Sequence, residues 1–258
     1  MTKIDDKNFD DLSSRFQKNI YSTAKGKIRL SILWRDLIEI IPGIENGGLS
    51  VLDAGAGQGN FALQLAQKNH HLTLCDVSKN MLSDAEELFT ENKLAADVGF
   101  IHTPVQNLSE HIDTQYDIVL FHAVLEWLAE PEETLRELLK YVKPGGYLSL
   151  MFYSRTGLIF QNLTRGNFDY IKNNSLSGNG KTLTPINPLL PEDVYMWLSN
   201  FGLDTKVKSG VRTFYDGISR ERRKQIDEDE LIELEKHYSR IKPYNELARY
   251  IHVISRKP

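Results

Sequence analysis

Apolar residues follow two alternating spacings between residues 49 and 153. Short continuous apolar runs, typical of buried strands, are each followed by a segment in which apolar residues recur at helical intervals. Strands are predicted over 49–54, 72–75, 98–102, 116–121 and 147–152, and helices over 59–69, 79–90 and 131–141. This alternation predicts a largely parallel sheet with helices on both faces.

The segments on either side of this core follow other patterns. Residues 9–41 have helical spacing in two successive stretches, the second ended by Pro42 and Gly43. Residues 154–190 are rich in Asn, Gly, Ser and Thr and show no clear element, which is typical of a functional insert. The tail predicts helices over 191–200 and 227–240 and strands over 202–214 and 249–255.

Composition and charge narrow the class of protein. The 258 residues are 41% hydrophobic, which supports a packed core and excludes disordered and collagen-like classes. The net charge of -4 excludes a generally basic nucleic-acid binder. However, residues 1–152 hold 14 Lys and Arg against 22 Asp and Glu, whereas residues 153–258 hold 17 against 13. The positive C-terminal part indicates an acidic partner, or only uneven solvated helix surfaces.

Cysteine content and hydropathy restrict the compartment. Cys75 is the single cysteine, which excludes an intrachain disulfide and a zinc site built from several cysteines. The N-terminus is polar and carries no apolar signal-peptide core, and the longest apolar run, 118–125, is too short to cross a bilayer. We therefore expect a cytoplasmic protein with no membrane partner.

The clearest local motif is Val51-Leu-Asp-Ala-Gly-Ala-Gly-Gln-Gly59, at the end of the first core strand. Its glycines permit a tight turn from strand into helix, and the N-terminus of that helix suits anionic or polar ligand groups. Asp76 follows the next strand, where a carboxylate can accept both hydroxyls of a ribose. Its alternative role is to cap the next helix. The combination predicts an adenosine-type cofactor, and NAD and S-adenosylmethionine both fit.

Three details resemble the class I S-adenosylmethionine-dependent methyltransferases. The glycines are spaced G-x-G-x-G, Asp53 lies two residues before the first of them, and a Lys-Pro-Gly-Gly turn over 143–146 precedes the fifth strand. A short-chain dehydrogenase would need a Tyr-x-x-x-Lys motif beyond the middle of the sheet, whereas Tyr21 and Lys25 precede the glycine loop. The resemblance covers about residues 49–152 and implies a Rossmann-like α/β fold with a mostly parallel, seven-stranded sheet.

The same resemblance implies a binding mode for S-adenosyl-L-methionine. In that family the glycine loop carries the methionine end, the acid after the second strand holds the ribose, and the end of the fourth strand lines the methyl site. Arg29 would pair with the methionine carboxylate from an N-terminal helical lid, or would be an ordinary solvated arginine. The implied cofactor residues are Arg29, Asp53, Gly55, Ala56, Gly57, Asp76, Val77, Met81, Val105, Gln106 and His122.

Seven short segments, spread over almost the whole chain, form a more specific pattern. They are Asn8-Phe-Asp-Asp11, Asn19-Ile-Tyr21, Lys25-Gly26, Phe121-His-Ala-Val-Leu-Glu-Trp127, Leu150-Met-Phe-Tyr153, Gly166-Asn-Phe-Asp-Tyr170 and Arg249-Tyr-Ile-His252. In this order they resemble the family of bacterial tRNA 5-carboxymethoxyuridine methyltransferases. The resemblance implies methyl esterification of the carboxymethoxy group on wobble uridine 34, with a tRNA anticodon stem-loop as partner. A carboxylate is already ionised at neutral pH, so we expect no catalytic base and no metal.

The predicted fold is one domain, 1–258, with three parts. They are an N-terminal helical lid (1–48), a cofactor-binding core (49–153), and an insert with a C-terminal part that faces the substrate and tRNA (154–258). Trp127 follows the fourth core strand, where an exposed indole could stack on a base or could instead pack under the insert. Basic residues of the insert and tail could pair with phosphates, although most charge runs are solvated faces. The expected substrate contacts are Tyr21, Lys25, Trp127, Tyr153, Arg165, Lys181, Arg212, Arg220, Arg222 and Arg223.

Two other function classes stay open at this point. A small-molecule carboxyl or oxygen methyltransferase would use the positive insert as a lid over an acidic substrate. A catalytically inactive protein of this fold would only bind RNA or another partner. The intact glycine loop and Asp76 argue against the inactive protein.

Overall fold

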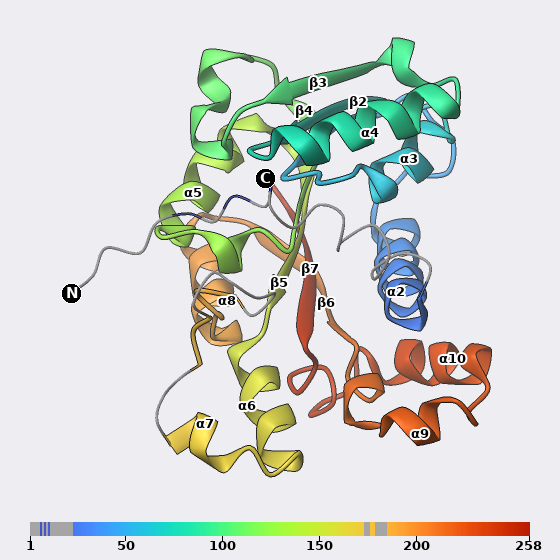
Figure 1. The fold of residues 1–258 in the computed structure, drawn as a ribbon. Helices are drawn as coiled ribbons and strands as arrows, with labels where there is room; N and C mark the ends of the chain where they lie inside the picture. Colours follow the sequence, from blue (N-terminus) through green and yellow to red (C-terminus); the bar gives the residue numbers. More distant parts are fainter. Residues whose placement is uncertain (1–5, 7, 9, 11–22, 173–175, 179–184) are drawn as a thin grey trace.

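Seven strands form one sheet through the centre of the molecule (Figure 1). The computed structural model describes residues 6, 8 and 10 and the ranges 23–172, 176–178 and 185–258. The strand order is β3-β2-β1-β4-β5-β7-β6. The strands are β1 (Ser50–Ala54), β2 (His71–Asp76), β3 (Val98–His102), β4 (Tyr116–His122), β5 (Val142–Tyr153), β6 (Asp204–Val211) and β7 (Tyr250–Arg256).

Strand direction follows the prediction. Strands β1 to β5 pair in parallel, whereas β7 is antiparallel to both of its neighbours, β5 and β6. The order reverses between β1 and β4, so the connections from these two strands leave in opposite directions. In open α/β sheets such a switch point forms a crevice at the carboxyl ends of the strands, where ligands bind. The seven-stranded, mostly parallel Rossmann-like fold is confirmed.

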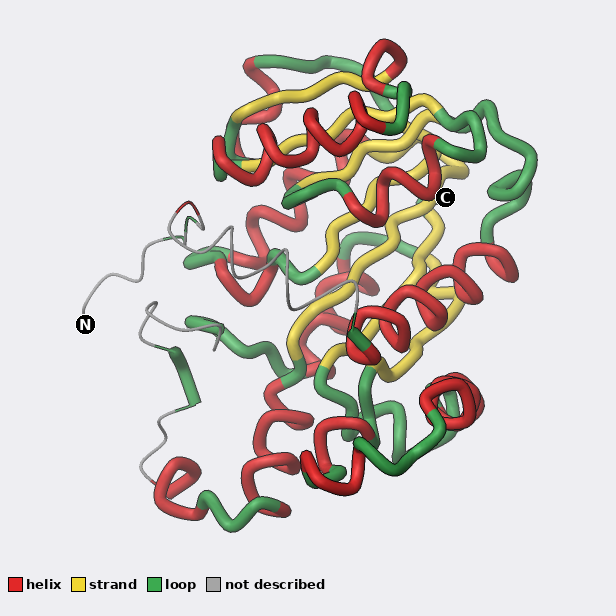
Figure 2. The backbone as a smooth tube through the Cα atoms, turned by 45° about the vertical axis from the view of Figure 1, so that its right-hand side comes forward, coloured by secondary structure: helices red, strands yellow, loops and turns green. Residues whose placement is uncertain are grey.

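Helices cover both faces of the sheet (Figure 2). On one face α2, α3, α4 and α10 enclose a core that includes Ile32, Leu65 and Leu120; on the other face α5 and α8 enclose a core that includes Leu135 and Val194. None of the described helices is long and apolar enough to cross a membrane. The longer helices are α2 (Ala24–Ile40), α3 (Asn60–Ala66), α4 (Lys79–Glu91), α5 (Pro131–Leu138), α6 (Arg155–Thr164), α8 (Pro191–Asn200) and α10 (Glu228–Tyr238).

The structure departs from the sequence prediction after β5. The segment 154–190, predicted without clear elements, contains α6 and the short helix α7 (Phe168–Lys172). Ser154 caps α6 by accepting a hydrogen bond from Gly157 N. The turn predicted over 143–146 lies inside β5, where the pairing with β4 shifts in register. Apart from Asp10, the first predicted N-terminal helix lies outside the described residues.

Candidate functional site

A pocket of about 400 Å³ opens at the carboxyl ends of β1, β2, β4 and β5, at the switch point of the sheet. Helix α2 and the ends of β6 and β7 form its other side. All eleven residues that the sequence predicts as cofactor contacts line this pocket. They come from five separate parts of the chain, which the fold brings to one place.

The glycine loop forms the floor of the pocket between β1 and α3. Gly55 has a φ of 79°, and a Cβ atom on it would lie 2.4 Å from Val124 Cγ2. The amides of Gly55 and Ala56 donate to Cys75 O at 2.8 and 3.0 Å, which ties the loop to β2. A side chain at position 55 would therefore be strained and would clash, so glycine is required for this close approach.

Asp76, the last residue of β2, presents its carboxyl group to the pocket. Oδ2 accepts a hydrogen bond from Gly57 N at 2.7 Å, and Oδ1 accepts one from Ser78 N at 2.8 Å. Burial raises the pKa of Asp76, although these backbone hydrogen bonds oppose the shift. Ser78, and not Asp76, is the N-cap of α4. Each carboxyl oxygen has a further lone pair, so Asp76 can accept two hydroxyls of a ribose.

Asp53 and His122 lie on neighbouring strands beside the glycine loop. Burial, together with the charge of Asp76, raises the pKa of Asp53 to about 7. His122 ends β4, and its Nε2 atom lies 2.8 Å from Ser149 Oγ. Burial lowers the pKa of His122 well below its ordinary value, so its imidazole is neutral at neutral pH. His122 is therefore neutral, and Asp53 keeps its proton to a higher pH than an ordinary aspartate.

Gln106 closes the pocket on the side of β3. It follows the strand in a 3-10 helix, η3 (Val105–Glu110), together with the buried Val105. Gln106 Nε2 donates to Asp6 Oδ2 at 2.7 Å, and Asp6 Oδ1 accepts Ala129 N at 2.7 Å. Asp6, which sequence reasoning missed, thus joins two loops at the rim of the pocket.

Four cationic side chains, Lys25, Arg29, Arg212 and Arg249, line the side of the pocket formed by α2, β6 and β7. Arg212 Nη2 and Arg249 Nε bond opposite oxygens of Asp216, at 2.6 and 2.7 Å. Burial raises the pKa of Asp216, but the two guanidinium groups outweigh burial and hold it below its ordinary value. This side of the pocket therefore carries an excess of positive charge.

Arg212 and Arg249 differ in the donors that they leave free. Arg249 is also bonded to Tyr153 Oη at 2.9 Å and to Gln161 Oε1 at 2.5 Å. Arg212 is only 7% exposed and has a φ of 64°, a conformation that costs energy in a residue other than glycine. Its Nε atom is buried and has no hydrogen-bond partner among the described residues. Arg212 therefore lines the pocket and keeps one buried donor that no described residue uses.

The predicted substrate residues divide into three groups. Lys25, Trp127, Tyr153 and Arg212 line the pocket. The four arginines at positions 165, 220, 222 and 223 are absent from its described lining. Tyr21 and Lys181 lie outside the described residues.

The structure decides details of two of these predictions. Trp127 is only 8% exposed, so the first of its two alternatives, an exposed indole, is absent; the turn after β4, η4 (Leu125–Trp127), folds this ring inward to the pocket wall. Arg212, expected at the phosphate surface, is buried by its ion pair with Asp216. Arg165 is also partly engaged, because its Nη2 donates to Asp216 O.

Sequence reasoning missed Arg249, Tyr250 and Glu126 as pocket residues. The guanidinium carbon of Arg29 lies 4.9 Å from the centre of the Tyr250 ring, a cation–π contact. Tyr250 begins β7 and Arg249 directly precedes it, almost two hundred residues after the glycine loop, so no local motif marks them. The signal for all three residues was the family pattern, which includes the segments 121–127 and 249–252.

Glu126 provides a prediction on pH. Burial raises its pKa to about 7 from an ordinary value of 4.5, and Oε2 has no partner among the described residues. Between pH 4.5 and about pH 7, Glu126 is protonated in the folded state and ionised in the unfolded state. The free energy of unfolding therefore falls as the pH rises through this range. We expect Glu126→Gln to raise the free energy of unfolding by about 1–3 kcal/mol at about pH 8, and by little at about pH 4. Urea titrations at both pH values, with the exposed Glu130→Gln as control, measure this; equal effects at both would contradict it.

Comparison with known proteins agrees with this geometry. Residues 52–150 match the family described as "Methyltransferase domain". The magnesium protoporphyrin IX methyltransferase of Synechocystis PCC 6803 superposes with a TM-score of 0.64 at 14% identity, covering 97% of this chain and 96% of that one. A [4+2]-cyclase superposes with a TM-score of 0.61 at 19% identity, covering 93% and 86%. The fold is that of the class I methyltransferases, and the methyltransferase domain match covers its central strands.

A full-length relative gives the narrower assignment. Over 256 residues the chain is 42% identical to the tRNA 5-carboxymethoxyuridine methyltransferase of Escherichia coli (strain K12), covering 99% of this chain and 98% of the relative. The same identity and coverage hold for the protein from Escherichia coli O157:H7. The chain belongs to the family of tRNA 5-carboxymethoxyuridine methyltransferases.

Proposed function

We propose that this enzyme uses S-adenosylmethionine to methylate the carboxylate of 5-carboxymethoxyuridine at wobble position 34 of tRNA, giving 5-methoxycarbonylmethoxyuridine. The main evidence is that one pocket contains two kinds of site. Gly55 to Gly57 with Asp76 form a site suited to an adenosine-type cofactor, and the four cationic side chains line the opposite wall. A carboxylate substrate complements that wall. The full-length relationship to an enzyme named for this substrate supports the same reaction.

The residues present fit the proposed cofactor. When bound, S-adenosylmethionine supplies a methyl group on a positively charged sulfur. Asp76 would hold the ribose, Val105 and Gln106 would border the adenine, and Val77 and Met81 line the same part of the pocket. Arg29, whose Nε is buried without a partner among the described residues, would hold the methionine carboxylate. The neutral His122 adds no repulsion toward a cationic sulfur.

Positioning is the main task of the protein in this reaction. The substrate carboxylate is already ionised at neutral pH and needs no general base. Orientation and exclusion of water can supply a large part of the rate enhancement. The Arg212 guanidinium, which lines the pocket, would donate one hydrogen bond to the carboxylate, whereas Arg249 is engaged by Asp216, Tyr153 and Gln161. A single donor orients the carboxylate and leaves its second oxygen free to react.

Arg29 is the side chain that tests the cofactor's methionine end. We expect Arg29→Ala to weaken binding of S-adenosylhomocysteine by about tenfold, the scale of a hydrogen bond to a charged group, with little change in the melting temperature of the free protein. Calorimetry and thermal unfolding measure the two effects. Lys27→Ala is the matched control, because the exposed Lys27 lies on the same helix and pairs with Glu228. A large loss of stability with normal affinity would show a structural role.

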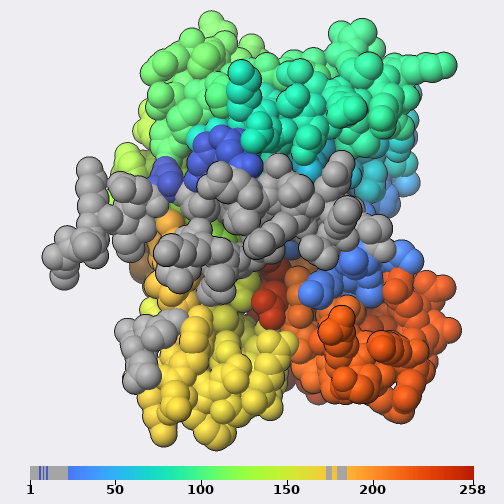
Figure 3. All heavy atoms as spheres, in the orientation of Figure 1, coloured from blue at the N-terminus to red at the C-terminus, as the bar shows by residue number. Residues whose placement is uncertain are grey.

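The anticodon stem-loop would approach the pocket across the C-terminal part of the chain. Figure 3 shows α6 and α7 (yellow) and α9 and α10 (orange) as neighbouring bulges on one face. Arg220 and Arg222, in α9 (Arg220–Arg223), are exposed, whereas Arg223 donates to Ile218 O and stacks on the Tyr215 ring. Arg220 and Arg222 are therefore the better candidates for phosphate contacts.

Salt dependence tests this surface. We expect the double variant Arg220→Ala, Arg222→Ala to reduce the slope of log affinity for tRNA against log salt by about two, because each lost phosphate contact removes about one unit. The control removes Lys140 and Lys206, which lie near the amino ends of β5 and β6, away from the pocket edge. Equal slopes in both double variants would place the RNA surface elsewhere.

The proposed reaction is tested with labelled S-adenosylmethionine and bulk tRNA from cells that lack this protein. We expect label in the tRNA that mild alkali releases, because esters are alkali-labile. Label in free carboxylic acids without tRNA would instead identify a small-molecule methyltransferase. No transfer to either, with cofactor bound, would contradict the proposed function.

A further inference from the structure

A row of hydrogen-bonded polar side chains leads from the pocket into the interior of the protein. His122 Nε2 lies 2.8 Å from Ser149 Oγ, and Ser149 Oγ lies 2.9 Å from His252 Nε2. His252 Nδ1 lies 2.7 Å from Asp36 Oδ2. Ser149, His252 and Asp36 are fully buried, so the row connects a pocket residue with the core side of α2.

Strand register creates this row. His122 of β4 pairs with Met151 of β5, and Met151 pairs with His252 of β7. Side chains two residues apart on a strand share a face, so Ser149 lies beside Met151 on the same side of the sheet. The Ser149 hydroxyl therefore lies between two imidazoles whose ring centres are 5.7 Å apart.

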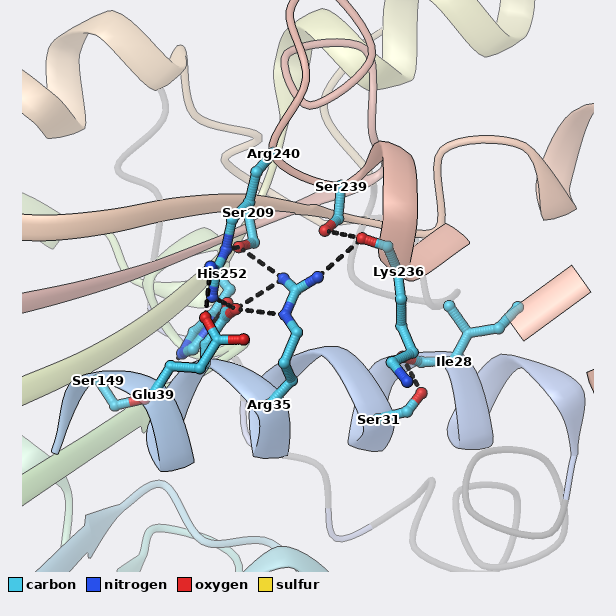
Figure 4. Close-up of polar contacts among 11 residues, drawn as sticks. Ile28, Ser31, Arg35, Glu39, Ser149, Ser209, Lys236, Ser239, Arg240 and His252 are labelled. Atoms are coloured by element: carbon cyan, nitrogen blue, oxygen red, sulfur yellow. Dashed lines mark hydrogen bonds and ion pairs between the residues drawn. The ribbon is translucent and has the colours of Figure 1, made fainter. Parts of the chain in front are cut away.

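Asp36 fixes the far end of the row. Its Oδ1 accepts hydrogen bonds from Arg35 Nη2, at 2.7 Å, and from Arg240 Nη2. Its Oδ2 faces His252 Nδ1. Figure 4 shows Arg35, Arg240 and His252 converging from α2, the segment after α10, and β7. Burial raises the pKa of Asp36, but His252 and Arg35 outweigh burial and hold it well below its ordinary value. Asp36 is therefore an ionised acceptor.

The charges around Asp36 determine the direction of the hydrogen bonds. Arg35 and Arg240 are balanced by Asp36 and by Glu39, which bonds Arg240 Nη1 at 2.6 Å. Because the ionised Asp36 can only accept, the His252 hydrogen bond runs from Nδ1 to Asp36, and with its proton there the imidazole accepts at Nε2 from the Ser149 hydroxyl. Ser149 Oγ then accepts a hydrogen bond from the Nε2–H of His122. The Nδ1 atom of His122 therefore carries the lone pair.

We propose that Asp36, His252 and Ser149 are positioning residues that hold His122 as the Nε2–H tautomer, so that Nδ1 accepts a hydrogen bond from the ammonium group of the cofactor's methionine end. His122 lines the pocket, and its Nδ1 has no partner among the described residues. Arg29 lies on the same helix as Asp36, two turns earlier. Packing of α2 against the sheet would thus place both contacts to the amino acid end of the cofactor. Arg29 would contact its carboxylate, and His122 would contact its ammonium group. The inference rests on the cofactor part of the proposed function and is independent of the tRNA.

Ligand affinities of two serine variants test the proposal. We expect Ser149→Ala to weaken S-adenosylhomocysteine about tenfold, because His122 loses the acceptor that holds its proton on Nε2, and Nδ1 is then no longer kept free to accept from the ammonium group. Its affinity for 5′-methylthioadenosine, which lacks the amino acid end, should stay within about twofold. Ser209→Ala is the matched control: Ser209 is also fully buried and accepts from Arg35 and Arg240, yet lies outside the row to His122. Equal weakening of both ligands by Ser149→Ala, or none, would overturn the proposal.

The tautomer itself can be observed. Long-range proton–nitrogen NMR spectra of the ¹⁵N-histidine-labelled free protein should show His122 with its proton on Nε2, and His122→Asn identifies the signal. A proton on Nδ1 would overturn the proposal, because the row would then run in the opposite direction. Since neither experiment uses RNA, both outcomes are separate from the failure of the tRNA reaction.

Discussion

Replacing Asp76 with alanine is expected to weaken S-adenosylmethionine binding by about 1.5–3 kcal/mol, the range for lost hydrogen bonds to a charged group. The carboxyl oxygens of Asp76 each accept one backbone amide, from Gly57 and from Ser78, and each can accept one ribose hydroxyl. The substitution therefore removes the ribose contacts and also loosens the glycine loop. Calorimetry with S-adenosylmethionine and S-adenosylhomocysteine measures the loss.

Asp117→Ala is the matched control for this variant. Asp117 lies in β4 near its amino end, where its Oδ2 accepts Ser50 N at 2.8 Å and Ser50 Oγ at 2.7 Å. It should lose some stability but keep normal cofactor affinity, because it lies outside the described lining of the pocket. Unchanged affinity in a folded Asp76→Ala protein would remove Asp76 from the cofactor site.

Arg212→Gln is expected to reduce kcat/KM for modified tRNA by about 10- to 100-fold, from the loss of a charge-assisted hydrogen bond to the reacting carboxylate. Asp216 keeps its ion pair with Arg249, so its carboxylate is not left alone in the interior. Affinity for S-adenosylhomocysteine and for tRNA without the carboxymethoxy group should stay within about twofold. A normal kcat/KM, or an equal loss in cofactor affinity, would show that Arg212 does not orient the substrate.

The central part of the fold was predictable because the core strands are nearly continuous apolar runs separated by amphipathic helices. The positions of Gly55, Gly57 and Asp76 followed from the same alternation, since strand ends in a parallel sheet lie at one edge. Eleven predicted cofactor residues accordingly line one pocket.

The insert was not predictable from local pattern. Helix α6 contains Gly157, where a Cβ atom would lie 1.9 Å from Ala248 O, so this glycine serves close packing against the segment before β7. Asn, Ser and Thr in the same segment weaken helical propensity further. Tertiary contacts, and not propensity, determine the helix there.

The cationic wall also depends on tertiary structure. Arg212 and Arg249 meet only because β6 and β7 are antiparallel neighbours, whose paired ends place Val211 opposite Tyr250. Charge counting indicated a positive C-terminal half, but it could not distinguish Arg212, buried against Asp216, from the exposed Arg220. Pairing partners far apart in sequence decide which cations face the pocket.

The most direct measurement of the central claim is nucleoside mass spectrometry of tRNA that carries 5-carboxymethoxyuridine, after incubation with the enzyme and S-adenosylmethionine. We predict that 5-carboxymethoxyuridine decreases as its methyl ester, 5-methoxycarbonylmethoxyuridine, appears, with an equal amount of S-adenosylhomocysteine, and that Asp76→Ala slows both. Methylation at any other atom, or unchanged 5-carboxymethoxyuridine with a cofactor-saturated enzyme, would contradict the account.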